Sequence, residues 1–220
     1  MVTTGRLKLV HESYKFFAKQ TYLEKKLLIV TDCDEKPYAE IKEIAHKDKE
    51  VLVLYVGSNE RQTLGDLRNL SLEHAPSDLS IQWDDDDWYG PTRIMDQWLG
   101  LKDAKAVMLT QQLHFFRDTK QVALVNDYTG IEGTLLFDRR CGLRYPGERR
   151  GEDTVLKKQL KEKNLVNLIP GGLCYCRTYH GDNTWERGHH MGRVVRMNKP
   201  ITKAQLKEAE RIYMTKMLTM

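Results

Sequence analysis

Residues 82–89, QWDDDDWY, place four consecutive aspartates between two tryptophans. Adjacent carboxylates repel one another and make poor strand or helix, whereas the flanking indoles favour burial. Carboxylate oxygens are the ligands that Mg²⁺ and Mn²⁺ prefer, and such ions often hold a substrate's phosphates as well. The Asp-x-Asp spacing occurs twice, so two side chains can point the same way. The segment predicts a divalent-cation site; a solvated acidic turn and a two-metal nuclease or phosphatase centre are the alternatives.

Two later stretches carry groups suited to the same chemistry. GEDTVL places Glu152 and Asp153 at the start of a helix, where carboxylates also complement the helix dipole. YCRTYHGDNTW contains His180, which alone fits a structural histidine equally well. A zinc-stabilised binding module is a further alternative, and its soft ligands would come from Cys174, Cys176, His180, His189 and His190. Cys-x-Cys is not the spacing of a zinc knuckle, and strand alternation would put both sulfurs on one face.

The elements that must position these groups follow from the apolar pattern. Strands are predicted at 25–32, 50–56 and 78–83, and helices at 6–20, 38–46 and 64–75. This alternation favours an α/β layer with a mostly parallel sheet. Ligands bind such sheets at the carboxyl ends of the strands. Asp32 and Asp34 follow the first of these strands and the aspartate block follows the third, so both acidic groups are expected on one rim.

The second half has a different pattern. Residues 104–118 and 121–127 predict strands joined in a hairpin or meander, and 133–140 and 171–180 predict two more. Residues 151–164 predict a helix. Residues 202–217 predict an amphipathic helix, which either packs on the domain or makes weak contact with a membrane surface.

Bulk composition limits the function classes. The chain has 220 residues, 40% hydrophobic and 30% charged, which predicts one compact globular domain without repeats or linkers. Its apolar runs are too short to span a bilayer, no secretory signal opens the chain, and four cysteines do not require disulfides, so cytoplasmic folding is expected. A net charge of +4 with dispersed basic residues suits small anions and does not indicate a nucleic-acid partner.

Six segments, in order, resemble those of the inverting nucleotide-sugar glycosyltransferases of the GT-A fold, family 2 type. VTTGR resembles the family's PTYNR, KQTY the phrase closing its first helix, and LLIVTDCD its IIVVDDGS. Residues 64–91 resemble its G..RN.G…DDDD…P stretch, GEDTVL its Glu-Asp motif, and YHGDNTW its His-x-x-Asn-(Thr/Ser) stretch. The resemblance covers about residues 2–185. The chain departs from the family pattern at Val2, where proline is expected, and at Thr31-Asp32-Cys33-Asp34; its first strand must be very short, or the sequence trimmed.

The resemblance implies a single GT-A (Rossmann-like, nucleotide-binding) domain over residues 1–220, with a mixed, mostly parallel sheet flanked by helices. Residues from about 1 to 100 would bind the nucleotide sugar, and residues from about 101 to 220, ending in a helix, would bind the acceptor. The implied reaction moves a sugar from a nucleotide-diphosphate sugar, UDP-sugar favoured, to a hydroxyl of a glycan or glycosylated acceptor. Mn²⁺ or Mg²⁺ would neutralise the diphosphate.

The resemblance also implies residue roles. Asp153 would be the catalytic base that deprotonates the acceptor hydroxyl. Asp86 would be the direct metal ligand, with Asp84 near the ribose and the metal, and with His180 reaching the metal or diphosphate. Asp32 would accept a hydrogen bond from the base, and Asp85 or its neighbour Asp87 would contact the sugar. The donor-binding residues are Thr3, Thr4, Arg6, Asp32, Arg68, Asp84, Asp85 and Asp86.

Overall fold

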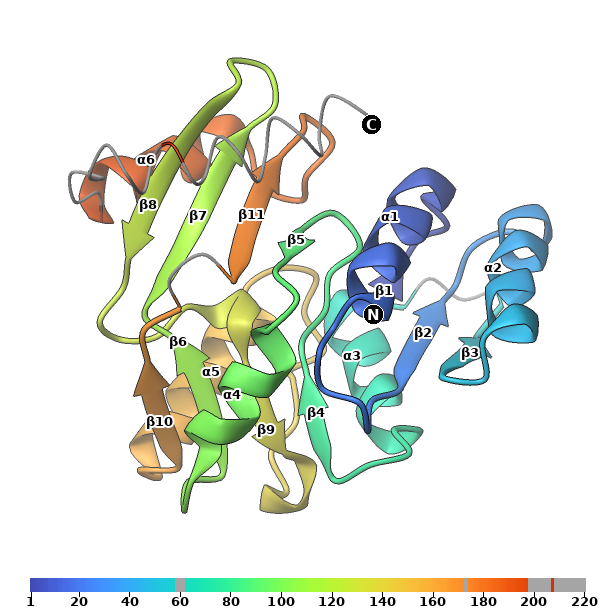
Figure 1. The fold of residues 1–220 in the computed structure, drawn as a ribbon, viewed down its shortest axis with the longest axis horizontal. Coiled ribbons are helices and arrows are strands. Elements are labelled where there is room, and N and C mark those ends of the chain that lie inside the picture. Colours follow the sequence, from blue (N-terminus) through green and yellow to red (C-terminus); the bar gives the residue numbers. More distant parts are fainter. Residues whose placement is uncertain (58–61, 172–173, 198–206, 208–220) are drawn as a thin grey trace.

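The computed structural model describes residues 1–57, 62–171, 174–197 and 207 (Figure 1). The first half contains β1 (Val2–Thr3), α1 (Leu7–Ala18), β2 (Leu27–Thr31), α2 (Glu35–Lys47), β3 (Val51–Tyr55), α3 (Leu64–Glu73), β4 (Leu79–Ile81), β5 (Trp88–Tyr89) and α4 (Arg93–Leu101). The second half contains β6 (Ala106–Leu109), β7 (Gln111–Phe116), β8 (Gln121–Asn126), η1 (Glu132–Thr134), β9 (Leu136–Asp138), η2 (Arg139–Cys141), α5 (Glu152–Glu162), β10 (Val166–Ile169), β11 (Tyr175–Tyr179) and α6 (Arg187–Met197).

The first three strands form a parallel sheet in the order β1-β2-β3, with helices in the connections. The predicted α/β alternation is thereby confirmed. β1 has only two residues, Val2 and Thr3. β4 departs from the prediction: it pairs antiparallel with β9 in a second sheet, ordered β10-β6-β9-β4. A single parallel bridge, Val2 to Asp84, links the two sheets.

The predicted hairpin of the second half is confirmed by the antiparallel pair β7 and β8. The strand predicted at 104–118 is divided into two strands that belong to different sheets. β6 lies between β9 and β10, whereas β7 belongs to the third sheet, ordered β5-β11-β7-β8. The helix at 151–164 and the strands at 133–140 and 171–180 are confirmed as α5, β9 and β11. Helix α4 and strand β10 were not predicted. The helix predicted at 202–217 lies outside the described residues, of which Lys207 is the sole member there.

Both tryptophans that flank the aspartates are buried in the main hydrophobic core. Trp83 stacks on Tyr89 with ring centroids 3.7 Å apart and meets Phe17 edge-on. Its indole Nε1–H donates to Ser13 Oγ at 2.9 Å, so the one polar atom of this buried side chain has a hydrogen-bond partner. The core of the first sheet therefore fixes the backbone on which the carboxylates stand.

Cys33, Cys141, Cys174 and Cys176 are all free thiols. Burial raises the pKa of Cys174 to about 11 and that of Cys176 well above its ordinary value. Both side chains of the Cys-x-Cys pair thus belong to the core and are held as neutral thiols. Within the described ranges, none of the helices has the length and apolar character needed to cross a bilayer.

A buried pair of histidines, His114 and His190, predicts that acid destabilises the fold. His114 Nε2 lies 2.8 Å from His190 Nδ1, and both side chains are almost inaccessible to solvent. Burial, followed by the neighbouring His190 and Arg177, lowers the pKa of His114 to about 2, and burial together with Arg177 lowers that of His190 to about 3. Above pH 6.5 both residues are neutral whether the chain is folded or unfolded, so they leave stability unchanged. Below pH 6.5 only the unfolded chain takes up their protons.

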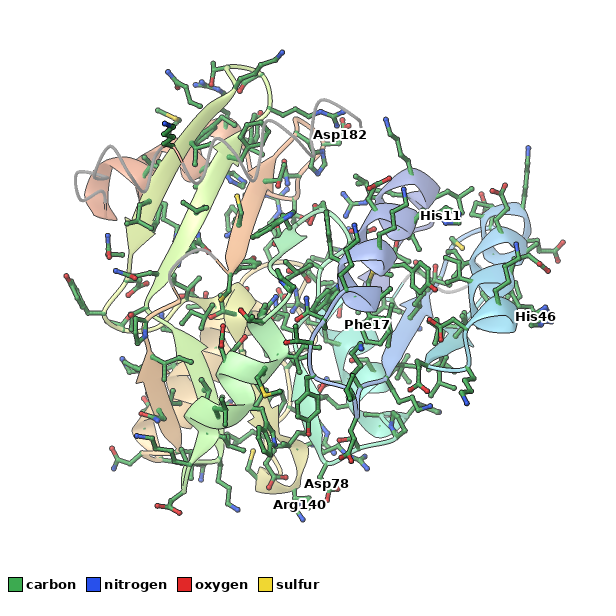
Figure 2. The ribbon with its side chains drawn as sticks, in the orientation of Figure 1. His11, Phe17, His46, Asp78, Arg140 and Asp182 are labelled. Carbon is green, nitrogen blue, oxygen red and sulfur yellow. The ribbon has the colours of Figure 1, made fainter. Side chains whose placement is uncertain are left out.

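We therefore expect the free energy of unfolding to fall by about 1.4 kcal/mol per pH unit per histidine between about pH 6 and pH 4. Urea unfolding at several pH values measures this slope. His114→Gln/His190→Gln should flatten it, although its stability at pH 7.5 will be lower. The matched control is His46→Gln, because His46 lies on the outer face of α2 (Figure 2) with a 60%-exposed side chain. An equally steep slope in the double variant would contradict this origin of the acid sensitivity.

Candidate active site

The aspartate block forms the turn between β4 and β5, at the end of the buried segment that contains Trp83. The Tyr89 hydroxyl accepts from Asp84 N–H at 2.6 Å and donates to Asp84 C=O at 2.9 Å. Beneath the turn, the fully buried guanidinium of Arg93 lies 4.7 Å from the ring of Tyr89 and 4.8 Å from that of Tyr175. A stack of aromatic rings and a buried cation thus hold the turn rigidly and offset part of its negative charge.

Asp85 faces inward and organises the β1–α1 loop. It accepts from the Thr3 hydroxyl at 2.6 Å and pairs with the Arg6 guanidinium, and its side chain is 1% exposed. The chain turns at Gly5 with φ +86°, a conformation that favours glycine. A side chain is also excluded there because an added Cβ would lie 2.6 Å from Cys33 Cβ. The expected contact of Asp85 with the donor sugar finds no support in this geometry, because its oxygens are already engaged.

Asp86 occupies the centre of the site. Its Oδ2 lies 3.2 Å from His180 Nε2 and 3.2 Å from the Arg6 guanidinium, and it accepts from Asn183 Nδ2 at 3.4 Å. Burial alone would raise the pKa of Asp86, but the His180 hydrogen bond and the Arg6 charge lower it below its ordinary value. Asp86 is therefore held as a carboxylate, and the two halves of the chain meet on it.

Asp87 is buried and ties the turn to β11. Its carboxylate accepts from the Tyr175 hydroxyl at 2.5 Å and from Thr178 N–H at 3.0 Å. Burial, together with the neighbouring Asp86 and Asp84, raises the pKa of Asp87 to about 8, so it is largely protonated at neutral pH. Like Asp85, it positions the backbone. Because both of its oxygens already accept hydrogen bonds, the geometry gives no support to a contact with the donor sugar.

Arg68 connects the aspartate block to the Glu-Asp motif. Its guanidinium pairs with Asp84 at 3.2 Å on one side and with Glu152 at 3.1 Å on the other. Burial alone would lower the pKa of Arg68, but these carboxylates raise it above its ordinary value. Glu152 is 2% exposed, and burial raises its pKa despite the opposing Arg68 charge. Arg68 therefore holds Asp84 turned toward α3 and fixes the start of α5.

Asp153 is the outward member of the Glu-Asp pair. It is partly exposed at the first turn of α5, and its Oδ1 accepts from Thr154 N–H at 2.7 Å. The charge of Asp153 raises the pKa of both Arg68 and Arg177. A carboxylate with a free oxygen at this position can accept a proton from a group bound over the aspartate turn.

Two sequence-predicted donor residues stand apart from this network. Asp32 follows β2 and is half-buried, and Thr4 is exposed in the loop that leads to α1. Both lie at the carboxyl ends of β1 and β2, on the rim predicted to carry the ligand. No side-chain contact joins either of them to the aspartate block within the described residues.

Arg177, Asn183 and Tyr175 belong to the site, although sequence reasoning did not assign them. Arg177 is half-buried on β11, and its charge acts on Asp86, Asp87 and Asp153. Across the described part of the chain, its guanidinium makes no hydrogen bond or ion pair. The signal was present in YCRTYH, because strand alternation puts Arg177 on the same face as Tyr175 and just ahead of His180.

The donor set at Asp86 fits a hard divalent cation. A carboxylate and an imidazole suit Mn²⁺, and two protein ligands leave positions for phosphate and water oxygens. The buried negative charge of the turn also favours a bound cation. Burial and the neighbouring Asp86 raise the pKa of Asp85 to about 6, although the Arg6 charge lowers it. Within the described ranges, three or more His, Cys, Asp or Glu side chains nowhere converge as a ready-made metal cage. Asp84 in particular turns to Arg68, so Asp86 and His180 are the pair suited to a cation.

Comparison with known proteins identifies the chain's relatives. The sequence model of glycosyl transferase family 2 matches residues 1–160. Among curated proteins, none matches this sequence. S. aureus TarS 1–349, solved in complex with UDP, has a TM-score of 0.64 at 14% identity, over 89% of this chain and 68% of that one.

A second relative is the mannosyltransferase PcManGT from Pyrobaculum calidifontis, solved in complex with GDP-Man and Mn²⁺. It gives a TM-score of 0.64 at 13% identity, over 94% of this chain and 66% of that one. The longer S. aureus TarS structure gives 0.63 at 14% identity, with 40% of that chain covered. These likenesses establish the GT-A fold, and the present chain spans about two thirds or less of each neighbour.

Proposed function

The chain belongs to glycosyl transferase family 2 and is a glycosyltransferase of the GT-A fold, and from this premise we propose that it is a metal-dependent, inverting enzyme. Its donor is a nucleotide-diphosphate sugar, and its acceptor is a hydroxyl, most simply that of a glycan. The observation that carries the proposal is the meeting of Asp86, His180 and Arg6 at one carboxylate oxygen. Asp153 is a partly exposed carboxylate whose charge acts on Arg177, and Arg177 in turn acts on Asp86.

The nucleotide lies along the carboxyl ends of β1 and β2 in this proposal. Asp32 accepts a hydrogen bond from the base, and Thr4 and Arg6 border the ribose and phosphates. Thr3 supports the loop through Asp85, so its contribution to the donor is through the backbone. Arg68 shapes the pocket by holding Asp84 toward the ribose.

The leaving diphosphate is stabilised at the opposite side of the aspartate turn. A divalent cation, Mn²⁺ or Mg²⁺, held by Asp86 and His180 supplies Lewis-acid stabilisation of the departing charge. Arg177 adds a second cation, since its guanidinium has no carboxylate partner within the described residues and lies within electrostatic reach of Asp86 and Asp153. A guanidinium can form two parallel hydrogen bonds to phosphate oxygens.

Inversion requires one base on the acceptor side. Asp153 takes the proton of the acceptor hydroxyl. At the same time the acceptor oxygen forms a bond to the anomeric carbon, and the sugar–phosphate bond breaks. Helix α5 holds Asp153 in place, because Glu152, one residue earlier, is anchored to Arg68 at 3.1 Å. In this proposal, residues from about 1 to 100 bind the donor and the later residues bind the acceptor. The four free cysteines fit a reducing compartment, the cytoplasm.

UDP is the favoured nucleotide, and a thermal-shift comparison of UDP-, GDP- and dTDP-sugars with and without Mn²⁺ tests both donor and metal. We expect the cognate donor at 100 times its Kd to add about 2.7 kcal/mol of stability, and only when Mn²⁺ is present. For a chain of this size that is a rise in Tm of roughly 5–10 °C. Equal shifts without metal would contradict metal dependence. Absence of a shift with every nucleotide sugar, despite intact folding by circular dichroism, would contradict the donor class.

A further inference from the structure

The short helix η1 carries a buried carboxylate that the proposed mechanism does not use. Glu132 Oε1 accepts from Lys157 Nζ at 2.8 Å, and Glu132 Oε2 accepts from the Arg193 guanidinium at 2.6 Å. The three side chains are only 10–13% exposed. Burial would raise the pKa of Glu132, but Arg193 and Lys157 lower it to about 2, so Glu132 is ionised at neutral pH.

Asp127 completes this buried cluster. Its Oδ2 lies 3.7 Å from Lys157 Nζ and 3.5 Å from the Arg193 guanidinium, and its side chain is 7% exposed. Lys157 Nζ also donates to Gly130 C=O. Two carboxylates therefore balance two cations. Removal of one partner from a buried ion pair leaves an uncompensated charge, which is strongly destabilising. The cluster is therefore expected to hold its elements in one arrangement.

Helix η1 is also fixed to the support of the aspartate turn. One nitrogen of the Arg93 guanidinium donates to Gln82 C=O at 3.0 Å and to Gly133 C=O at 3.3 Å. An added Cβ at Gly133 would lie 2.8 Å from the Tyr175 hydroxyl, which itself donates to Asp87 at 2.5 Å. The same arginine and tyrosine thus contact both η1 and the aspartate turn.

Lys157 connects η1 to the helix that carries the proposed base. It lies four residues after Asp153, so the two share one face of α5. Glu152, which pairs with Arg68 at 3.1 Å, precedes Asp153 by about 100° around the helix axis, and Lys157 follows Asp153 by about 40°. The two anchors therefore flank Asp153, and together they fix the rotation of the helix that directs this carboxylate.

Arg193 connects the same carboxylate to the other side of the site. It belongs to α6, which follows the loop that carries His180 and Asn183. Both of these side chains contact Asp86. Because only residues 184–186 separate Asn183 from α6, the position of α6 limits how far this loop can reach toward the aspartate turn.

Building on the proposed function, we propose that Glu132 is a positioning residue for the transfer reaction. It acts through Lys157 on Asp153 and through Arg193 on the loop that carries His180. The base and the metal ligands keep their separation because both segments are fixed to Glu132, and η1 is fixed to the aspartate turn. Among the described residues, Glu132 makes no hydrogen bond or ion pair with Asp86, His180 or Asp153, so it does not touch the reacting groups itself.

The two connections predict different kinetic effects. Lys157→Met should lower kcat by about 10- to 100-fold, since a displacement of about 1 Å at a reacting group can cost 10²-fold. Its KM for the donor should stay within about twofold. Arg193→Gln should instead weaken nucleotide-diphosphate affinity in Mn²⁺, and Glu132→Gln should show both losses. Because Glu132 and Lys157 act as a unit, their double variant should lose no more kcat than Glu132→Gln alone.

Steady-state rates and calorimetric titration with Mn²⁺ measure these effects. Lys158→Met is the matched control, because Lys158 is 76% exposed on the same helix, and kcat should be unchanged. Each buried change should also lower Tm, so rates are measured well under the lowest Tm. Val51→Ala, in the core at the amino end of β3, controls for lost stability alone. It should lower Tm and keep kcat.

Hydrogen exchange gives a readout that needs no substrate. Val155 N–H donates to Gly151 C=O at 3.2 Å at the start of α5. Its exchange should be about tenfold faster in Lys157→Met and unchanged in Lys158→Met.

Three results would overturn the positioning role. They are unchanged kcat in Lys157→Met, equal losses of kcat and donor affinity in that variant, and a loss of kcat in Val51→Ala as large as in Lys157→Met. Failure of the proposed function is distinguishable, because the unaltered chain would then transfer no sugar from any nucleotide sugar. Even in that case, unchanged exchange at Val155 in Lys157→Met would show that Lys157 does not anchor α5.

Discussion

Asp153→Asn is expected to lower the rate of sugar transfer by about 10³-fold, while the affinity for the nucleotide diphosphate stays within about twofold. The change removes the proton acceptor and keeps the size of the side chain. Asp153 is partly exposed, and among the described residues its side chain forms hydrogen bonds with Thr154 alone. Asparagine can preserve the bond to Thr154 N–H through its amide oxygen, so folding and donor binding should be unaffected.

Steady-state transfer rates and calorimetric titration of the nucleotide measure the two quantities. The matched control is Asp103→Asn, an exposed aspartate in the turn after α4, which should leave both unchanged. Glu152→Gln separates position from catalysis, because it keeps Asp153 but weakens the anchor on Arg68 at 3.1 Å. That variant should lose both stability and rate. Equal loss of transfer and of nucleotide affinity in Asp153→Asn would contradict its assignment as the base.

The sequence predicted the strands and helices of this fold better than it predicted which strands pair with one another. The runs at 25–32 and 50–56 are continuous and apolar, and they became parallel strands β2 and β3. β4 was recognised as a strand, but its antiparallel partner β9 lies more than fifty residues later. Helix α4 escaped notice because its buried face is partly polar: Arg93 and Gln97 are inaccessible and bond to backbone carbonyls. Hydrophobic periodicity does not register a helix that buries such groups.

For the site, likewise, the sequence predicted the residues but not their individual roles. Spacing within DDDD predicted that Asp84 and Asp86 could act together, yet the structure directs the four carboxylates to separate tasks. Asp85 and Asp87 look equivalent to their neighbours in sequence, and only the fold reveals that Thr3 and Tyr175 engage them. Arg68 holds Asp84 from 16 positions away, whereas the partners of Asp85, Asp86 and Asp87 lie 79 or more positions away. No local pattern carries that information.

Asp86→Ala is expected to abolish the metal-dependent part of nucleotide-diphosphate affinity, a loss of about 100-fold or more with Mn²⁺ present. Residues that merely orient a metal ligand already cost about 10–100-fold when removed, and Asp86 is the carboxylate beside His180 at 3.2 Å. Without Mn²⁺ no loss of affinity is expected. Asp86 also occupies the Arg6 guanidinium at 3.2 Å, so its removal frees a cation for the phosphates. Metal-free affinity should therefore hold steady or rise slightly.

Calorimetric titration of the nucleotide diphosphate with Mn²⁺ and with chelator gives both affinities. Asp85→Asn is the matched control, because it removes a neighbouring charge from the same turn but one that is 1% exposed and engaged with Thr3 and Arg6. It should lower Tm and keep the Mn²⁺ dependence. If Asp86→Ala binds as tightly with Mn²⁺ as the unaltered chain, the cation is not held at Asp86. If Asp85→Asn instead loses the Mn²⁺ dependence, the inward-facing aspartate must reorient to hold it. The ratio of the two affinities in each variant thus shows whether Asp86 or Asp85 contacts the metal.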